Sequence, residues 1–177
     1  ARLLALELEA SVRGARADVL GFRSAVAVHG IVRTSLAGGA ASSDGITLAD
    51  WRNRLARRLM AELQAKPNYA QFRIIGIADG GREILRVDRS RPGDAPRVVP
   101  DSELQRKGDR DYFLQALRLP DGESDISPIE LNQEHGVIET PLLPVMRAVT
   151  PIYAPDGKPF GLIIINVELQ SAFSHIR

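Results

Sequence analysis

The fold is decided by residues 145–167, VMRAVTPIYAPDGKPFGLIIINV. Two apolar stretches of strand length flank Pro155-Asp156-Gly157-Lys158, and proline, aspartate and glycine are the residues that form tight turns. We therefore expect an antiparallel hairpin in which residues 145–153 pair with residues 160–167.

The register of this hairpin follows from its turn. With four residues in the loop, Tyr153 pairs with Phe160, and counting back sets Arg147 opposite Asn166 on one face of the sheet. Two polar residues among apolar neighbours indicate the wall of a binding pocket. An ion pair between Arg147 and Glu168, or a similar acid, at the sheet edge explains the pattern equally well.

An earlier part of the chain predicts a second hairpin, because two apolar stretches surround Asp79-Gly80-Gly81. No helix returns between paired strands as a parallel βαβ unit would require, so we expect an α+β fold with an antiparallel sheet. The expected elements are strands at 72–77 and 84–87, a loop at 90–100, a helix at 102–117 and an extended segment at 124–138.

Two helices precede the strands. Residues 1–36 contain no proline and repeat apolar residues every three or four positions, which predicts one long amphipathic helix. Such a helix is roughly 45 to 50 Å long at 1.5 Å per residue, more than the ~40 Å diameter of a compact domain of this size, so we expect it to span or project from the domain. Thr47 and Asp50 form a capping box that begins a second helix, which ends near Lys66.

Composition limits the function. The 177 residues are 44% hydrophobic and 25% charged, as in soluble globular domains. The net charge of +1 leaves no broad basic face, so we expect no nucleic-acid partner. Cysteine is absent, which excludes disulfides and thiol chemistry, and the longest apolar stretch, residues 162–167, is too short to cross a membrane. Ala1 in place of Met predicts that the chain is a piece of a longer protein.

No catalytic motif is present in the sequence: it has no phosphate-binding glycine loop, no G-x-S-x-G and no H-E-x-x-H. We therefore expect no catalytic residue, resident metal or cofactor. One alternative is a small metal-assisted hydrolase, because the carboxylates of Glu130, Glu134 and Glu139 beside His135 are possible ligands for a hard cation.

The stretch with most chemical information is residues 102–116, SELQRKGDRDYFLQA. The planar guanidinium of Arg110 beside the aromatic wall of Tyr112 suits a small anion. Alternatively, Arg110 pairs with Asp109 or Asp111 and the aromatic residues only anchor a helix to the sheet.

Together with DGGREILRV at 79–87 and PIYAPDGKPFG at 151–161, this stretch resembles the Cache family of extracytoplasmic sensor domains, also described as PDC or PAS-like sensors. Arg110, Tyr112, Phe113 and Ala116 match the family's R-x-Y-F-x-x-A helix. The resemblance implies a long N-terminal helix, residues 1–36, packed on one Cache module, residues 37–177. It also implies a five-stranded antiparallel PAS-like sheet flanked by helices, with the motif helix closing over a ligand pocket.

The resemblance also implies a function. Residues 124–147 look like the bacterial subgroup that precedes histidine kinases and diguanylate cyclases. We therefore expect a non-catalytic, periplasmic or extracellular sensor domain of a membrane receptor, with flanking transmembrane helices and a histidine kinase, or alternatively a diguanylate cyclase or phosphodiesterase, as its output. The long helix favours a homodimer. A spacer that binds no ligand is the remaining alternative.

The expected ligand is a small carboxylate or other anion. The residues predicted to bind it are Arg110, Tyr112, Phe113, Ser127, Asn132 and Arg147.

Overall fold

The computed structural model describes residues 2–174. The helices are α1 (Arg2–Arg23), α2 (Val26–Leu36), α3 (Leu48–Ala65), α4 (Ala78–Gly81), α5 (Asp111–Ala116) and α6 (Gln170–Ser174), with a 3₁₀ turn at Asp101–Glu103. The strands are β1 (Tyr69–Gly76), β2 (Glu83–Asp88), β3 (Arg97–Val98), β4 (Asp125–Ile126), β5 (Glu130–Leu131), β6 (Gln133–Glu134), β7 (Val137–Ile138), β8 (Pro144–Tyr153) and β9 (Pro159–Glu168).

The main sheet is antiparallel, as the sequence predicts, in the order β3-β2-β1-β9-β8-β4, and β5 also pairs with β8. Within the described residues it therefore has seven strands rather than the five expected. Four of the seven, β1, β2, β8 and β9, are long, whereas β3, β4 and β5 are two residues each and only extend the edges of the long strands. The α+β class is confirmed.

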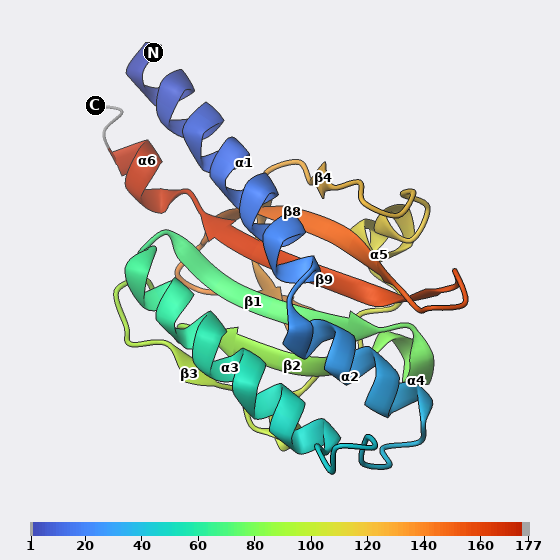
Figure 1. Cartoon of the computed structure of the whole chain (residues 1–177). Helices are drawn as coiled ribbons and strands as arrows, with labels where there is room; N and C mark the ends of the chain where they lie inside the picture. The colour runs from blue at the N-terminus through green and yellow to red at the C-terminus, as the bar shows by residue number, and fades with distance from the viewer. Residues whose placement is uncertain (1, 175–177) are drawn as a thin grey trace.

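The sheet separates two layers (Figure 1). The helices α1, α2 and α3 cover one face, and α5 with the segment around β4 lies on the other. Val19 of α1, Leu55 of α3, and Phe72 and Ile163 of the sheet are fully buried in the apolar core between the helices and the sheet. The opposite face of the sheet does not contribute to this core.

The predicted long helix is divided into two. Ala25 has extended backbone angles (φ −67°, ψ 139°), and the chain turns there from α1 into α2. The turn lets Phe22 of α1 and Val28 of α2 be buried in the same core. A straight helix of this length would carry its second half past the sheet, so burial of apolar surface outweighs helical continuity.

The helix expected at 102–117 is shorter, with only the 3₁₀ turn and α5 inside that range. The intervening segment pairs with the β1–β2 connection, since the amide of Lys107 donates to the carbonyl of Gly81 at 2.9 Å and that of Gly108 to Gly80 at 3.1 Å. A Cβ on Gly81, whose φ is +72°, would lie 2.5 Å from the Gly108 backbone. These glycines therefore allow the two backbones to touch and fix the position of Lys107.

The register predicted for the late hairpin is confirmed where it concerns the pocket, because Arg147 pairs with Asn166. Tyr153 pairs with Pro159 and not with Phe160, because the register shifts by one residue next to Tyr153. The capping box of Thr47 and Asp50 is also confirmed.

Candidate functional site

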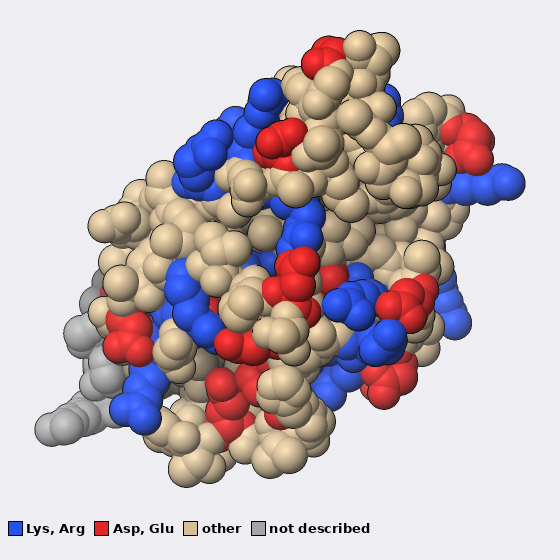
Figure 2. All heavy atoms as spheres, turned by 90° about the horizontal axis from the view of Figure 1, so that it is seen from below, with Lys and Arg blue, Asp and Glu red and all other residues tan. Residues whose placement is uncertain are grey.

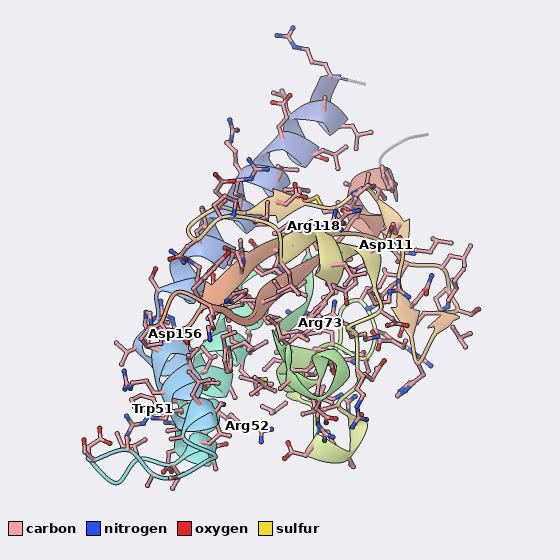
Figure 3. All side chains as sticks on the ribbon, turned by 90° about the vertical axis from the view of Figure 1, so that its right-hand side faces the viewer. Trp51, Arg52, Arg73, Asp111, Arg118 and Asp156 are labelled. Atoms are coloured by element: carbon pink, nitrogen blue, oxygen red, sulfur yellow. The ribbon has the colours of Figure 1, made fainter. Side chains whose placement is uncertain are left out.

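Charged and amide side chains are buried on the face of the sheet away from α1, α2 and α3. They include Gln71 and Arg73 of β1, Arg86 of β2, Arg147 of β8 and Asn166 of β9, all between 1% and 6% exposed. In Figure 3, Arg73 lies in the interior, well away from the helical layer that carries Trp51. Since buried charges are costly unless they are paired, this polar layer needs an explanation.

The polar layer is covered by α5 and by residues 130–143, which we call the strap. The strap contains β5, β6 and β7, and the β6–β7 turn uses positive φ angles at His135 (51°) and Gly136 (79°). Glu130, Asn132 and Glu134 of the strap make polar contacts with the sheet beneath them.

The centre of this layer is a narrow space that we call the chamber. It is filled so tightly by side chains that no water-sized sphere fits inside. No carboxylate lines it. Its lining residues are Arg73, Lys107, Arg110, Tyr112, Asn132, Gln133 and Arg147.

Tyr112 stands between two of the cations. The Cζ atom of Arg147 lies 5.1 Å from the centroid of its ring and that of Arg73 lies 5.7 Å away, both within the range of a cation–π interaction. The N-cap position of Arg110 on α5 places its guanidinium beside the strap, where it donates to Gln133 at 2.6 Å.

The buried arginines are only partly neutralised. Arg147 pairs with Glu130 at 2.8 Å, whereas Arg73 reaches Glu83 at the longer distance of 3.5 Å. The Nε–H groups of Arg73 and Arg147 have no hydrogen-bond partner. Burial, followed by the nearby charge of Arg73, lowers the pKa of Arg147.

Lys107 is buried beside these arginines, with 6% of its surface exposed. Among the described residues, no hydrogen bond or ion pair of its ammonium group is found. Burial and then the charge of Arg73 lower its pKa to about 8, against the pull of Glu134 and Glu83. The ammonium is therefore still mostly charged at neutral pH.

Glu134 fastens the strap beside the chamber. Its carboxylate accepts from Arg86 at 2.9 Å, from Gln71 at 2.8 Å and from Gln105 at 2.7 Å. Burial opposes the charged carboxylate, but Arg86 and Arg73 outweigh that effect and lower the pKa of Glu134 to about 2. The strap is thus held on the sheet largely by charge-assisted hydrogen bonds.

The chamber has an outer entrance. An open depression of about 620 Å³ lies in front of it, between α5 and the strap, and shares Arg110, Tyr112 and Gln133 with it. Asp109 and Asp111 stand at this outer side and are exposed to solvent.

The chain has relatives in sequence and in fold. The profile of the bacterial histidine kinase sensor domain matches residues 50–177. The chain belongs to this family of sensor domains. No curated protein matches it by sequence.

Solved structures show the same fold. A domain of a sensory box/GGDEF family protein from Vibrio parahaemolyticus superposes with a TM-score of 0.79 at 18% identity, covering 98% of this chain and 59% of that one. The extracellular domain of vpHK1S-Z8, described as a histidine kinase, gives 0.79 at 18% identity, with 98% and 56% covered. The ligand-binding domain of the Pseudomonas aeruginosa amino acid chemoreceptor PctC, in complex with GABA, gives 0.55 at 13% identity, with 98% and 59% covered. The sensor domain spans less than two thirds of each of these structures. The family match and the shared fold confirm the resemblance to Cache sensors.

The structure of the sensor domain brings four of the six predicted ligand residues together, because Arg110, Tyr112, Asn132 and Arg147 all line the chamber. Ser127 does not line it; its hydroxyl accepts from the backbone amide of Arg147 at 3.0 Å.

Phe113 also lies outside the chamber. It packs with Ile75, Leu162 and Ile164 in an apolar cluster between α5 and the sheet. Phe113 therefore fastens the motif helix, while its neighbour Tyr112 faces the cations.

Sequence reasoning missed three chamber residues, Arg73, Lys107 and Gln133. Arg73 interrupts the apolar run of the first hairpin, and a charge inside a buried strand was an available signal. Lys107 has no such signal, since its burial depends on the contact of Gly108 with a distant turn.

The acids considered for a metal serve other purposes in the sensor domain. Glu130 and Glu134 pair with Arg147 and Arg86, and Glu139 accepts from Asn132 at 2.8 Å. Within residues 2–174, no three His, Asp or Glu side chains are grouped so that they could hold a metal ion. Over the same residues, no helix is both long enough and apolar enough to cross a membrane.

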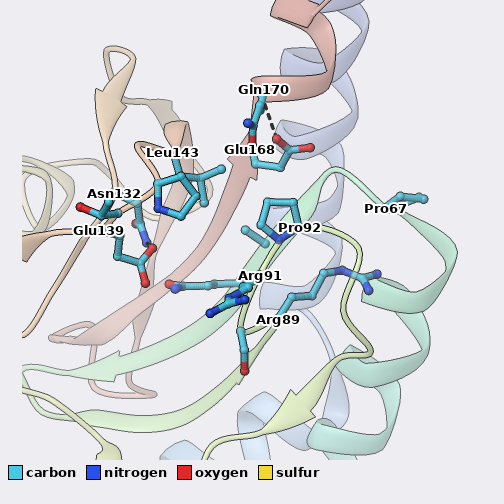
Figure 4. A pocket seen from close by; sticks show the side chains of 14 residues that line it. Pro67, Arg89, Arg91, Pro92, Asn132, Glu139, Leu143, Glu168 and Gln170 are labelled. Atoms are coloured by element: carbon cyan, nitrogen blue, oxygen red, sulfur yellow. Dashed lines mark hydrogen bonds between the residues drawn. The ribbon is translucent and has the colours of Figure 1, made fainter.

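A separate cavity of about 370 Å³ lies near α6 (Figure 4), with Asn132 and Glu139 on one side and Arg91 and Pro92 on the other. It carries both acidic and basic groups and shares only Asn132 with the chamber. The molecular surface seen in Figure 2 likewise shows basic and acidic side chains interspersed. The chamber therefore differs from this cavity, because its lining contains cations but no carboxylate.

Proposed function

We propose that this sensor domain binds a small anion, such as a carboxylate, in the chamber. The observation that supports the proposal is a set of four lining cations with no carboxylate in the wall. Arg73, Lys107 and Arg147 are buried beside Tyr112, and Arg110 is partly buried. A buried cation gains most from an anion that supplies both charge and hydrogen bonds.

Strand β8 connects the chamber to the core beneath α1, and we infer that it transmits the signal. Arg147 points to the chamber from this strand, while Met146 and Ala148 on either side of it belong to the core that α1 covers. The N-terminus of α1 and helix α6 lie at the same end of the molecule (Figure 1). An anion that binds one conformation more tightly than another would shift the population toward that conformation, and with it the position of β8 and the two terminal helices. The free energy of this shift cannot exceed the difference in binding free energy between the two conformations.

We further propose that the domain lies outside the cytoplasm between transmembrane helices of a larger receptor, and that it forms a homodimer through α1. The similarity to the extracellular domain of vpHK1S-Z8, described as a histidine kinase, supports a histidine kinase as the output. The Vibrio GGDEF relative supports the second candidate, a diguanylate cyclase. The sensor domain itself carries out no reaction in either receptor.

Calorimetric titration with small carboxylates tests the proposal. Arg110→Ala removes a charge-assisted hydrogen bond worth about 1.5 to 3 kcal/mol, so binding should weaken roughly ten- to a hundredfold while the fold is kept. Arg118→Ala is the matched control, because Arg118 follows α5 but is exposed and lies outside the chamber. Equal affinities of wild type and Arg110→Ala would contradict the assignment.

A further inference from the structure

The four cations that line the chamber differ in what neutralises them. Arg73 has a carboxylate partner from the sheet itself, Glu83, which is completely buried and belongs to β2. Both members of this pair lie on adjacent strands of the sheet, so the pair does not involve the strap. The cations that remain for a ligand are those of α5, β8 and the segment before α5.

The partner of Arg147 is of a different kind. Glu130 belongs to the strap, and its side chain is 48% exposed, whereas the side chain of Arg147 is 2% exposed. Glu130 can turn toward water at little cost, but Arg147 cannot leave the chamber. A ligand carboxylate is therefore able to replace Glu130 on Arg147.

Lys107 has no partner to be replaced. Its side chain is buried next to Arg73, and no acid lies in the chamber wall. When Glu130 turns away from Arg147, the chamber gains one more uncompensated charge. Two buried positive charges, on Arg147 and Lys107, then lack a counter-charge, whereas Arg110 is only partly buried and solvent screens its charge.

From this arrangement we propose that the chamber selects a small dianion, one negative charge of which displaces Glu130 from Arg147 while the other neutralises Lys107. This inference rests on the proposed function and narrows its ligand class. A monoanion would leave one buried cation uncompensated.

The same wall disfavours a zwitterion such as an amino acid. An ammonium group inside the chamber would meet Arg73, Lys107, Arg110 and Arg147 and no acid. The carboxylates of Asp109 and Asp111 lie in the outer depression, in contact with solvent, where an ion pair is worth little.

Binding requires the strap to move. Since the chamber holds no space even for a water molecule, a ligand must separate Gln133 from Arg110 and Glu130 from Arg147. Both contacts are polar and both are replaceable by ligand oxygens. Occupancy of the chamber is thereby coupled to the position of β5 and β6.

The test is calorimetric titration of the intact chain with matched pairs of probes: malonate, succinate and glutarate against their monoamides, which keep the shape and lose one charge. Inorganic sulfate serves as a compact dianion and 4-aminobutyrate as a zwitterion. We expect at least one dicarboxylate to bind ten times more tightly than its monoamide, and the zwitterion to bind more weakly than either.

Two substitutions locate the charges. In Lys107→Met the preference for the dicarboxylate over its monoamide should disappear, and the fold should survive because an unpaired buried charge is replaced by an apolar chain of similar length. Glu130→Gln should tighten binding of both probes, because it removes the competing carboxylate.

The outcomes separate the two proposals. If monoamides bind as tightly as dicarboxylates, or if Lys107→Met keeps the preference, the chamber binds anions but does not select dianions. If binding in Glu130→Gln is unchanged, Glu130 is not the group that the ligand displaces. If no anion of the series binds, the proposed function fails as well.

Discussion

Gly30 shows how one residue places a whole helix. A Cβ at this position of α2 would lie 2.2 Å from Cδ2 of Trp51, so only glycine lets the indole ring of α3 rest on the α2 backbone. Trp51 is 5% exposed, and the guanidinium of Arg54 lies 4.8 Å from its ring centroid on the outer side. Gly21 in α1, by contrast, has no atom within 4 Å of the site of a Cβ.

These two glycines form a matched pair for mutation. Gly30→Ala should lower the free energy of unfolding by about 1 to 3 kcal/mol, because overpacking against Trp51 outweighs the gain in helix propensity. Gly21→Ala should raise it by roughly 0.5 to 1 kcal/mol, since it gains propensity without a clash. Urea unfolding midpoints measure both effects, and a shift of the two variants in the same direction would show that the contact with Trp51 does not matter.

Helix α1 is only partly covered by other elements of the chain. Ala15, Val19 and Phe22 of its second half are buried against the sheet, but the first half extends past the sheet toward the N-terminus (Figure 1). There Leu6 is 54% exposed although it lies in a run rich in leucine. A second copy of α1 is the partner that our proposal of a homodimer assigns to this half.

Sedimentation at chain concentrations up to about millimolar tests the dimer. We expect reversible dimerisation in the wild type and a weaker dimer in Leu6→Arg, which adds a charge to the proposed interface. Val26→Arg is the control, because Val26 is 70% exposed but lies on α2. A monomer at every concentration, or an equal loss in the control, would argue against an interface on α1.

At the scale of the whole molecule, the features that the sequence predicted correctly are those set by residues close together in the chain. The four-residue turn between β8 and β9 gave the register, so the opposition of Arg147 and Asn166 was predicted, and the capping box of α3 needed only Thr47 and Asp50. The break at Ala25 was missed because no proline or local signal marks it; it depends on where the sheet ends.

The site was predicted only in part for the same reason. Arg110 and Tyr112 lie in a motif that is continuous in the sequence, and they face the chamber. Lys107 reaches it because Gly80 and Gly81 receive its segment, and Arg73 because β1 pairs between β2 and β9. Contacts between residues far apart in the chain are set by the tertiary fold, which a local pattern does not encode.

The claim that the chamber binds an anion is tested most directly by the Nε–H signals of Arg73 and Arg147, the buried donors that lack a partner in the chamber. Their resonances, assigned with Arg→Lys variants, are followed by NMR while the tightest-binding anion of the calorimetric series is added. We predict that both signals shift along one saturating curve with the calorimetric affinity. Unchanged signals of both arginines, with shifts confined to amides around Arg91 and Pro141 in the cavity near α6, would contradict the account.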